Sequence, residues 1–416
     1  MLPSFSPNGA EVLFERNGVI TCKSTTDSTS EEFSVSEILS GRSVSVDAFL
    51  QILPRVYVVA YTSNPEGPNQ EHRLAVIHDR QLHREKLFTE QIIHLAGNSR
   101  YLAVVHKSKI AVWEFKLTDY ELEPKIIFSV VEPLFTKTNV IVSSLREISP
   151  TDSSCTIAFP HQKQSGSIFH QTLSTSFFNA IPSHLTVSVP LVRANVDTSN
   201  LVNYTNTVEI HISETGAISS NPNPEPNQSG TPITDPKLLP QTYQMHQHEI
   251  QLLSFSPDGA YIASASTQGT RINVLDVKSN SLYYICSRSR SGKLSTLTSL
   301  AFSRNNQFLC AVGSTPTLHI FSLETQRKAP FFRNMFVYGK NVQAKIMGSP
   351  TVDASSNLDS VAKITVDVTP PTQYVLSFHV DQLLVLSSAG DLTKYKINVG
   401  ESVSAVISSP KTNLFH

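Results

Sequence analysis

Short runs of β-branched and aromatic residues, each bounded by turn residues, recur along most of the chain. Such runs predict β-strands, because branched and aromatic side chains pack well on a pleated surface. They occur at residues 56–61 (VYVVAY), 73–79 (RLAVIHD), 155–160 (CTIAFP) and 261–266 (YIASAS). No convincing amphipathic pattern of ten or more residues indicates a helix, so the sequence predicts an all-β chain.

Two longer runs have the pattern of β-hairpins. Residues 101–115 (YLAVVHKSKIAVWEF) are two apolar runs joined at His106-Lys107-Ser108, and residues 379–397 are two runs joined at Ala389-Gly390-Asp391. A short polar or glycine-containing connection between two such runs is the usual sign of antiparallel neighbours.

A repeat then predicts the architecture. The segment SFSPNGAEVLF (4–14) recurs as SFSPDGAYIAS (254–264) and weakly as AFSRNNQFLCA (301–311). The last two copies begin at residues 254 and 301, a spacing close to the ~40–45 residues of a four-stranded propeller blade. Trp113 is the single tryptophan, so the Trp-Asp signature is missing and the blades are degenerate WD repeats.

Two segments interrupt this rhythm. Residues 213–241 are rich in Pro, Ser, Asn and Gly, which predicts a flexible insertion. Residues 325–358 form a long excursion between strand-like runs, and its first half is basic and aromatic. Loops of that length inside a compact domain are usually functional or disordered. We expect one propeller domain over residues 1–416, with both segments as parts of it.

Composition narrows the function classes. The chain has 33 Lys and Arg against 34 Asp and Glu, which argues against a general nucleic-acid binder and leaves only a local patch for anions. Its four cysteines are far apart, and its first residues do not have the pattern of a signal peptide. No run of 18 apolar residues occurs. We expect a cytosolic monomer with reduced cysteines.

The search for catalytic motifs gives little. Ser291-Gly292-Lys293-Leu294 ends like a phosphate loop, but Ser287 stands where that loop needs a glycine and no helix is predicted to follow. His246 and His248 lack further ligands at metal-binding spacing, so a histidine bonded to a backbone carbonyl is the expected arrangement there. We therefore predict no enzyme activity, no metal and no cofactor.

Residues 248–324 resemble the PROPPIN family, in ASAS-x-x-GT-x-I-x-V (263–274), SLAFS (299–303) and TLHIF (317–321). Residues 90–115 and 153–168 look like the family's second and third blades, and residues 383–397 like its closing blade. The resemblance implies a seven-bladed β-propeller that binds the phosphoinositides PI3P or PI(3,5)P2. It further implies an effector or scaffold in autophagosome formation or endolysosomal traffic.

By the same resemblance, the protein would lie peripherally on preautophagosomal, endosomal or vacuolar membranes, with autophagy or trafficking proteins as partners. The family's two lipid pockets flank a Phe/Leu-Arg-Arg-Gly motif. Without gaps, Ser287-Arg288-Ser289-Arg290 falls on this motif, which keeps the first arginine as Arg288. With a two-residue gap, Gly292 falls on the glycine and Arg290-Ser291 becomes the pair. The double arginine is broken in both alignments.

Further pocket residues follow from the resemblance. Ser266 and Thr270 match hydroxyl residues of the first pocket, whose strand arginine is replaced by Asn273. Arg271, shifted by two, stays on the same face because side chains alternate along a strand.

For the second pocket, Thr296, Thr298 and His319 match, and either Arg290 or Lys293 would supply the charge. The 325–358 segment occupies the place of the family's membrane-inserting loop. Its candidate insertion residues are Arg327, Lys328, Phe331, Phe332, Arg333, Met335, Phe336 and Tyr338.

Two alternatives stay open. Arg288, Arg290 and Lys293 could be an ordinary charged turn in water. The chain could also be a PROPPIN-like propeller that has lost lipid binding and serves as a protein-protein interaction scaffold.

Overall fold

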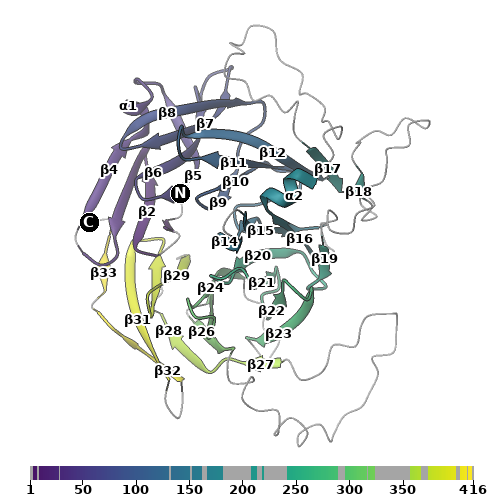
Figure 1. Cartoon of the computed structure of the whole chain (residues 1–416). Helices are drawn as coiled ribbons and strands as arrows, with labels where there is room; N and C mark the ends of the chain where they lie inside the picture. Colours follow the sequence, from purple (N-terminus) through teal and green to yellow (C-terminus); the bar gives the residue numbers. More distant parts are fainter. Residues whose placement is uncertain are drawn as a thin grey trace, which may run out of the picture.

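The chain forms seven β-sheets arranged as the blades of a propeller (Figure 1). This computed structural model describes residues 3–6, 9–27, 29–130, 133–149, 152–161, 166–180, 208–212, 218–219, 241–288, 296–315, 317–323, 357–366, 373–399, 403–409 and 411–414. The blades are numbered here in chain order. The predicted all-β, seven-bladed propeller is therefore confirmed.

In the first four blades neighbouring strands pair antiparallel, with the exception of one parallel pair in blade 3. Blade 1 comprises β1 (Ser4–Phe5), β2 (Glu11–Arg16), β3 (Val19–Ser24) and β4 (Ser30–Ser34), followed by α1 (Val35–Ile38). Blade 2 comprises β5 (Val44–Leu53), β6 (Val56–Ser63), β7 (Glu71–His78) and β8 (Gln81–Phe88). Blade 3 comprises β9 (His94–Gly97), β10 (Tyr101–Val105), β11 (Lys109–Lys116), β12 (Glu121–Val130), β17 (Val208–Ile212) and β18 (Ile218–Ser219). Blade 4 comprises β13 (Ile141–Val142), β14 (Arg146–Ser149), β15 (Asp152–Pro160), β16 (Ser167–Leu173) and β19 (Gln241–Gln244), with α2 (Thr175–Ala180) after β16.

The last three blades complete the ring. Blade 5 comprises β20 (Ile250–Phe255), β21 (Tyr261–Ser266), β22 (Arg271–Asp276), β23 (Ser281–Ser287) and β27 (Asn357–Asp359). Blade 6 comprises β24 (Leu297–Phe302), β25 (Phe308–Gly313), β26 (Thr317–Ser322) and β28 (Ala362–Thr365). Blade 7 comprises β29 (Tyr374–His379), β30 (Gln382–Ser387), β31 (Asp391–Val399), β32 (Val403–Ile407) and β33 (Thr412–Asn413).

The second strand of a blade is apolar throughout because it is covered on both faces. All eight residues of β6 are buried. Val58 and Ala60 pack against blade 3, whereas Tyr57, Val59 and Tyr61 pack against blade 1. A strand buried on both faces has a continuous apolar sequence instead of an alternating one, which explains the VYVVAY run.

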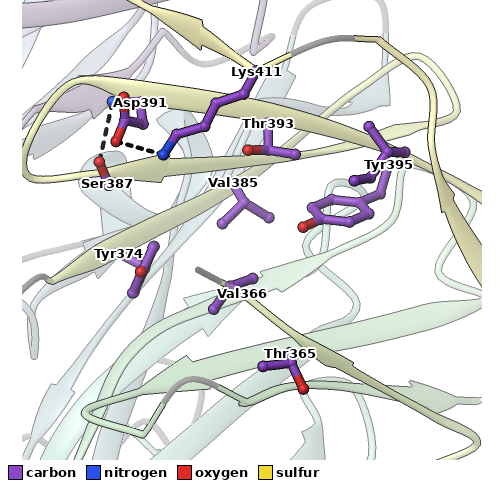
Figure 2. Close-up of a pocket in the computed structure, with 10 residues that line it drawn as sticks. Thr365, Val366, Tyr374, Val385, Ser387, Asp391, Thr393, Tyr395 and Lys411 are labelled. Atoms are coloured by element: carbon purple, nitrogen blue, oxygen red, sulfur yellow. Dashed lines mark hydrogen bonds and ion pairs between the residues drawn. The ribbon is translucent and has the colours of Figure 1, made fainter. Parts of the chain in front are cut away.

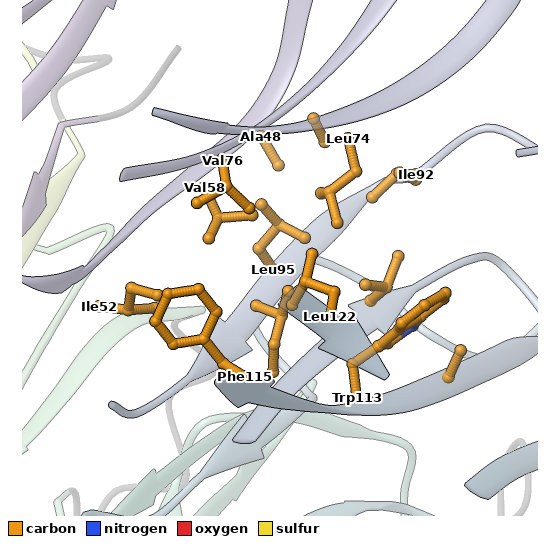
Figure 3. Packing of buried hydrophobic residues seen from close by; sticks show 14 of the residues in the cluster. Ala48, Ile52, Val58, Leu74, Val76, Ile92, Leu95, Trp113, Phe115 and Leu122 are labelled. Carbon is orange, nitrogen blue, oxygen red and sulfur yellow. The ribbon is translucent and has the colours of Figure 1, made fainter. Parts of the chain in front are cut away.

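Each pair of neighbouring blades shares a hydrophobic cluster, so the core is a ring of seven interfaces. Figure 3 shows the interface of blades 2 and 3, where Val58 and Leu74 face Leu95 and Trp113. Trp113, the single tryptophan, is thus a core residue between blades.

The sequence repeat corresponds to one recurrent turn, between the first and second strands of blades 1, 5 and 6. In each copy a serine hydroxyl accepts a hydrogen bond from the backbone N–H five residues later, at 3.0 Å for Ser6, 2.9 Å for Ser256 and 2.9 Å for Ser303. The turn also needs a residue in the left-handed region. Gly259 (φ 67°) provides it in blade 5, and Asn306 (φ 58°) does so in blade 6.

The ring closes between blade 7 and blade 1 without a shared strand. Among the described residues, blade 1 contains only strands from residues 4–34 and blade 7 only strands from residues 374–413. Two lysines connect the blades: Lys23 donates to the carbonyl of Leu414, and Lys394 to that of Thr25. The buried apolar residues of this interface are Val12, Leu384, Leu386, Leu392 and Leu414.

Three expectations about organisation need comment. Residues 90–115 and 153–168, expected in the second and third blades, lie in the third and fourth, because residues 44–88 already form a complete blade. The expected insertion at 213–241 includes β18, which pairs with β17, and its flexibility stays a prediction. The expected loop at 325–358 ends inside β27, a strand of blade 5.

Gly9 tests the closure of the ring. A Cβ at Gly9 (φ 68°) would lie 2.6 Å from the carbonyl oxygen of Phe378 in blade 7, whereas a Cβ at Gly18 (φ 78°) would meet nothing within 4 Å. Both Gly→Ala changes strain a left-handed residue, at about 1–2 kcal/mol. We expect Gly9→Ala to cost about 1–3 kcal/mol more than Gly18→Ala, because it also forces blades 1 and 7 apart. Urea unfolding of the two variants measures this difference, and equal losses would show that the approach of blade 1 to blade 7 is not a constraint.

Candidate functional site

Four of the predicted pocket residues meet at one end of blade 5, where β21 and β23 end and β22 begins. Arg271 lies opposite Ser287 in the register of β22 and β23. The backbone N–H of Arg288 donates to the carbonyl of Thr270 at 3.1 Å, and that of Gly269 donates to the carbonyl of Ser266 at 2.9 Å. Ser266, Thr270, Arg271 and Arg288 therefore form one group, as the resemblance implied.

The two arginines of this group differ in exposure. Arg271 is exposed, whereas only 5% of Arg288 is accessible to solvent. Burial lowers the pKa of Arg288, because its charged form loses hydration there. Arg288 is thus not part of an ordinary turn in water.

The side chain of Asn273 is bonded within the protein. Its Nδ2 donates to the carbonyl oxygen of Met245, and it lies opposite Ser264 in the sheet. The hydroxyl of Ser264 lies 2.9 Å from Nε2 of His246. The side chain of Asn273 lies on the same face of β22 as Arg271 and is held by its bond to Met245. Arg271 is therefore the positively charged side chain of this strand that can meet a ligand.

His246 behaves as the sequence predicted. Its Nε2 lies 3.1 Å from the carbonyl oxygen of Ser264, and burial lowers its pKa to about 4. In the part of the chain that the structure describes, no three His, Cys, Asp or Glu side chains come together as a metal-binding group. Within the same residues, no helix has the length and apolar character needed to cross a bilayer.

His319 brings blade 6 to the group. It is 6% exposed, and its ring is stacked on Phe321 with the centroids 6.2 Å apart. Burial first, and then the positive charges of Arg288 and Lys363, lowers the pKa of His319 to about 4. Arg288 of blade 5 and His319 of blade 6 are thus close enough to interact across the boundary between the two blades. We call Arg271, Arg288, His319 and Lys363 the cationic rim.

Lys363 is a member that sequence reasoning missed. It is exposed on β28 and lies directly opposite His319. Its signal was a lysine in a short, mostly apolar run, VAKITV (361–366), next to the segment expected to be a loop. Only the pairing of β28 with β26 places it beside the site.

The two threonines of the second pocket lie less favourably. The Oγ1 of Thr298 donates to the carbonyl oxygen of Tyr374 at 3.2 Å, which directs it toward blade 7. Thr296 is exposed just before β24, and its carbonyl accepts from Ser314 at 2.8 Å. The hydrogen bond of its hydroxyl therefore directs Thr298 toward blade 7 and not toward the cationic rim.

The remaining candidates lie outside the described residues. They are the two cations that follow Arg288 in the sequence and the whole set of insertion residues: Arg290, Lys293, Arg327, Lys328, Phe331, Phe332, Arg333, Met335, Phe336 and Tyr338.

Comparison with known proteins indicates a family. The PROPPIN family model matches residues 237–362, which include Arg271, Arg288 and His319 of the cationic rim but not Lys363. This match supports membership of the PROPPIN family.

Curated relatives match the chain over short segments. "Autophagy-related protein 18" of Kluyveromyces marxianus is 43% identical over 81 residues, which is 19% of this chain and 15% of that protein. Human "WD repeat domain phosphoinositide-interacting protein 1" is 39% identical over 83 residues, 20% of this chain and 18% of that protein. The chain thus matches less than a fifth of the length of either relative.

Solved structures agree on the fold. Kluyveromyces lactis Hsv2 has a TM-score of 0.58 at 10% sequence identity, covering 99% of this chain and 98% of that chain. A complex of KlAtg21 with the coiled-coil of AgAtg16 has a TM-score of 0.56 at 14% identity, covering 99% and 98%.

His319 gives a prediction for pH dependence. Between pH 6.5 and about 4 the unfolded chain protonates this histidine and the folded chain does not, so the unfolded state gains protons as the pH falls. Stability that is complete above pH 6.5 is therefore lost toward pH 4. We expect His319→Gln to reduce the loss between pH 7.5 and pH 5.0 by about 1–2 kcal/mol.

Urea unfolding at the two pH values measures this loss. The exposed His248 provides the matched control, as His248→Gln. An unchanged pH dependence in His319→Gln would contradict the placement of a buried, neutral His319 beside Arg288.

Proposed function

We propose that this protein binds the phosphorylated headgroup of a phosphoinositide, PI3P or PI(3,5)P2, at the cationic rim. In this proposal it is a peripheral membrane effector or scaffold in autophagosome formation or endolysosomal traffic. It would act as a monomer on preautophagosomal, endosomal or vacuolar membranes, together with autophagy or trafficking proteins. The two relatives' names refer to autophagy and phosphoinositide interaction.

The observation that carries the proposal is that β27 and β28 join the end of β23, which precedes the buried Arg288, to His319 of blade 6: Asp359 lies opposite Ser287, and Lys363 lies opposite His319. Arg271 and Lys363 add exposed positive charge on either side. The Nδ1 of His319 is buried and makes no hydrogen bond to any described residue. A phosphate in this place would supply an opposite charge to a partly dehydrated arginine and an acceptor for histidine, which are the strong kinds of phosphate contact.

The residues outside the described ranges fit the same proposal. Arg290 and Lys293 come two and five residues after Arg288 in the sequence and would add two cations to the site. Residues 327–338 come after β26 in the sequence, and their aromatic and basic side chains would suit the interface and headgroup layers of a membrane.

Liposome flotation tests the proposal. Purified protein is floated with liposomes containing PI3P or PI(3,5)P2, against liposomes without either. We expect the double variant Arg271→Gln/Lys363→Gln to weaken binding on the order of tenfold, because each basic residue near an anionic leaflet contributes about 1 kcal/mol. Both positions are exposed, so the fold should persist.

The control is Arg304→Gln, an exposed arginine in the turn between β24 and β25 of blade 6. Deletion of residues 331–338 should weaken flotation as well. Absence of lipid-dependent flotation at low salt would refute lipid binding, and normal flotation of the double variant would refute the assigned site.

The second candidate function is a protein-interaction scaffold without lipid binding. It is favoured by Asn273, whose amide is bonded to Met245 where relatives are expected to carry an arginine. Recovery of the same partner proteins by the wild type and the Arg271→Gln/Lys363→Gln variant, together with no flotation, would support this candidate.

A further inference from the structure

The outer edge of blade 7 is an apolar strand. β32 is the outermost strand of its sheet, and in the described part of the chain nothing pairs with its outer edge (Figure 1). Its sequence, VSAVI, contains no charged residue. Val406 is 55% exposed and Ile407 is 60% exposed. An apolar strand with an open edge is a template for pairing with another chain.

The outer strands of blades 1, 2 and 6 carry the charges that usually prevent such pairing. β4 contains Glu31 and Glu32, β8 contains Arg84 and Lys86, and β28 contains Lys363. Charged side chains on an edge strand oppose the docking of a further strand, because pairing would remove their hydration. β32 has no such protection.

Two blades of this protein already accept an added strand. β17 pairs in parallel with β12, the outer strand of blade 3, and β27 pairs in parallel with β23, the outer strand of blade 5. In both cases the added strand comes from a distant part of the chain. The outer edge of a blade can therefore hold an extended segment in this fold.

A cavity of about 200 Å³ adjoins β32, between blades 6 and 7 (Figure 2). Its inner wall includes the buried side chains of Tyr374, Val385 and Tyr395, and Ile407 of β32 belongs to its lining. Side chains alternate along a strand, so every second residue of an added strand would lie on the side of Ile407, next to this cavity. Its volume is that of one large side chain.

The charges around the strand favour an acidic partner. Lys396 and Lys363 are exposed on the neighbouring strands β31 and β28. Lys411 is bonded to Asp391 at 2.9 Å at the cavity (Figure 2). The described part of β28, β31, β32 and β33 thus has more positive than negative charge. Two copies of this chain paired through β32 would bring their lysines together, which disfavours self-association.

We propose that β32 and the adjoining cavity form a docking site for an extended segment of a partner protein. The segment adds to blade 7 as a strand along β32, places one large apolar side chain in the cavity, and directs Asp or Glu toward Lys363 and Lys396. Main-chain hydrogen bonds provide the affinity of such an interaction, and the side-chain pocket provides its selectivity.

Selection from a random nine-residue peptide library, displayed on phage and panned on the full-length protein, tests the proposal. The double variant Val406→Lys/Ile407→Lys serves for counter-selection. We expect enriched peptides with alternating apolar residues and flanking Asp or Glu. No enrichment over the double variant would overturn the proposal.

The most enriched peptide is then synthesised with a fluorescent label, and its affinity is measured by polarisation. We expect the double variant to raise the dissociation constant at least tenfold. Val380→Lys is the matched control, a 54% exposed valine in the turn between β29 and β30 of the same blade, and should change it less than twofold. Thr365→Trp, at the exposed rim of the cavity, should weaken binding without altering the edge strand.

Hydrogen exchange separates strand addition from other modes of binding. We expect the peptide to slow exchange of the amides of residues 403–407, and N-methylation of alternate peptide residues to abolish this effect. Binding without slower exchange there would overturn the proposal. So would amides already protected in the unliganded protein, or a dimer that the double variant disrupts, because another segment or a second copy would then occupy the edge. Liposome flotation of the double variant should be normal, which makes this test independent of lipid binding.

Discussion

Every blade of this protein depends on burial of both of its faces, and no blade can bury both without two neighbours. The alternation along β6 shows the constraint most directly, since successive residues pack against blade 1 and blade 3 in turn. Such a sheet exposes one apolar face if the ring is open anywhere. The junction of blades 7 and 1 is therefore decisive, and it consists of a small apolar cluster and two lysine-to-carbonyl bonds without an exchanged strand.

The same arrangement produces the cationic rim. Equivalent strand ends of neighbouring blades lie at the same end of the ring, so residues that follow β23 meet residues on β26. Arg288 and His319 are both more than nine-tenths buried, yet each lies where two blades adjoin. Burial raises the free energy of the charged forms of both side chains. An anionic ligand therefore stabilises those forms more strongly there than on an open surface.

Much of the fold could be predicted from local sequence. The serine turns, the hairpin at His106-Lys107-Ser108 and the apolar second strands all depend on neighbouring residues, and the structure contains them. Three of the four rim residues could also be predicted. Arg271 and Arg288 are separated only by one blade's turns, and His319 follows from the family resemblance. Lys363 and the direction of Thr298 could not, because both depend on which distant strand or blade lies alongside.

The parallel strands were also beyond sequence reasoning. β17 and β27 are short and follow long polar or mixed segments, and a parallel partner far along the chain has no local signature. The pairing partners of β17 and β27 depend on which blade edge lies close to them in space and is sufficiently apolar. The expected blade numbers of residues 90–115 and 153–168 were wrong for a related reason, since residues 44–88 form a blade without a copy of the serine turn.

The path of the chain through β27 has a consequence for the rim. After β26 of blade 6 the chain pairs with β23 of blade 5 and then returns to blade 6 as β28. One continuous segment of backbone therefore pairs with both blade 5 and blade 6. Within it, Asp359 lies opposite Ser287, the residue before Arg288. The two sides of the rim cannot separate without breaking this pairing, so the spacing of Arg288 and His319 is set before any ligand arrives. A ligand that fits this spacing loses little affinity to ordering the protein, and one that does not fit cannot widen it.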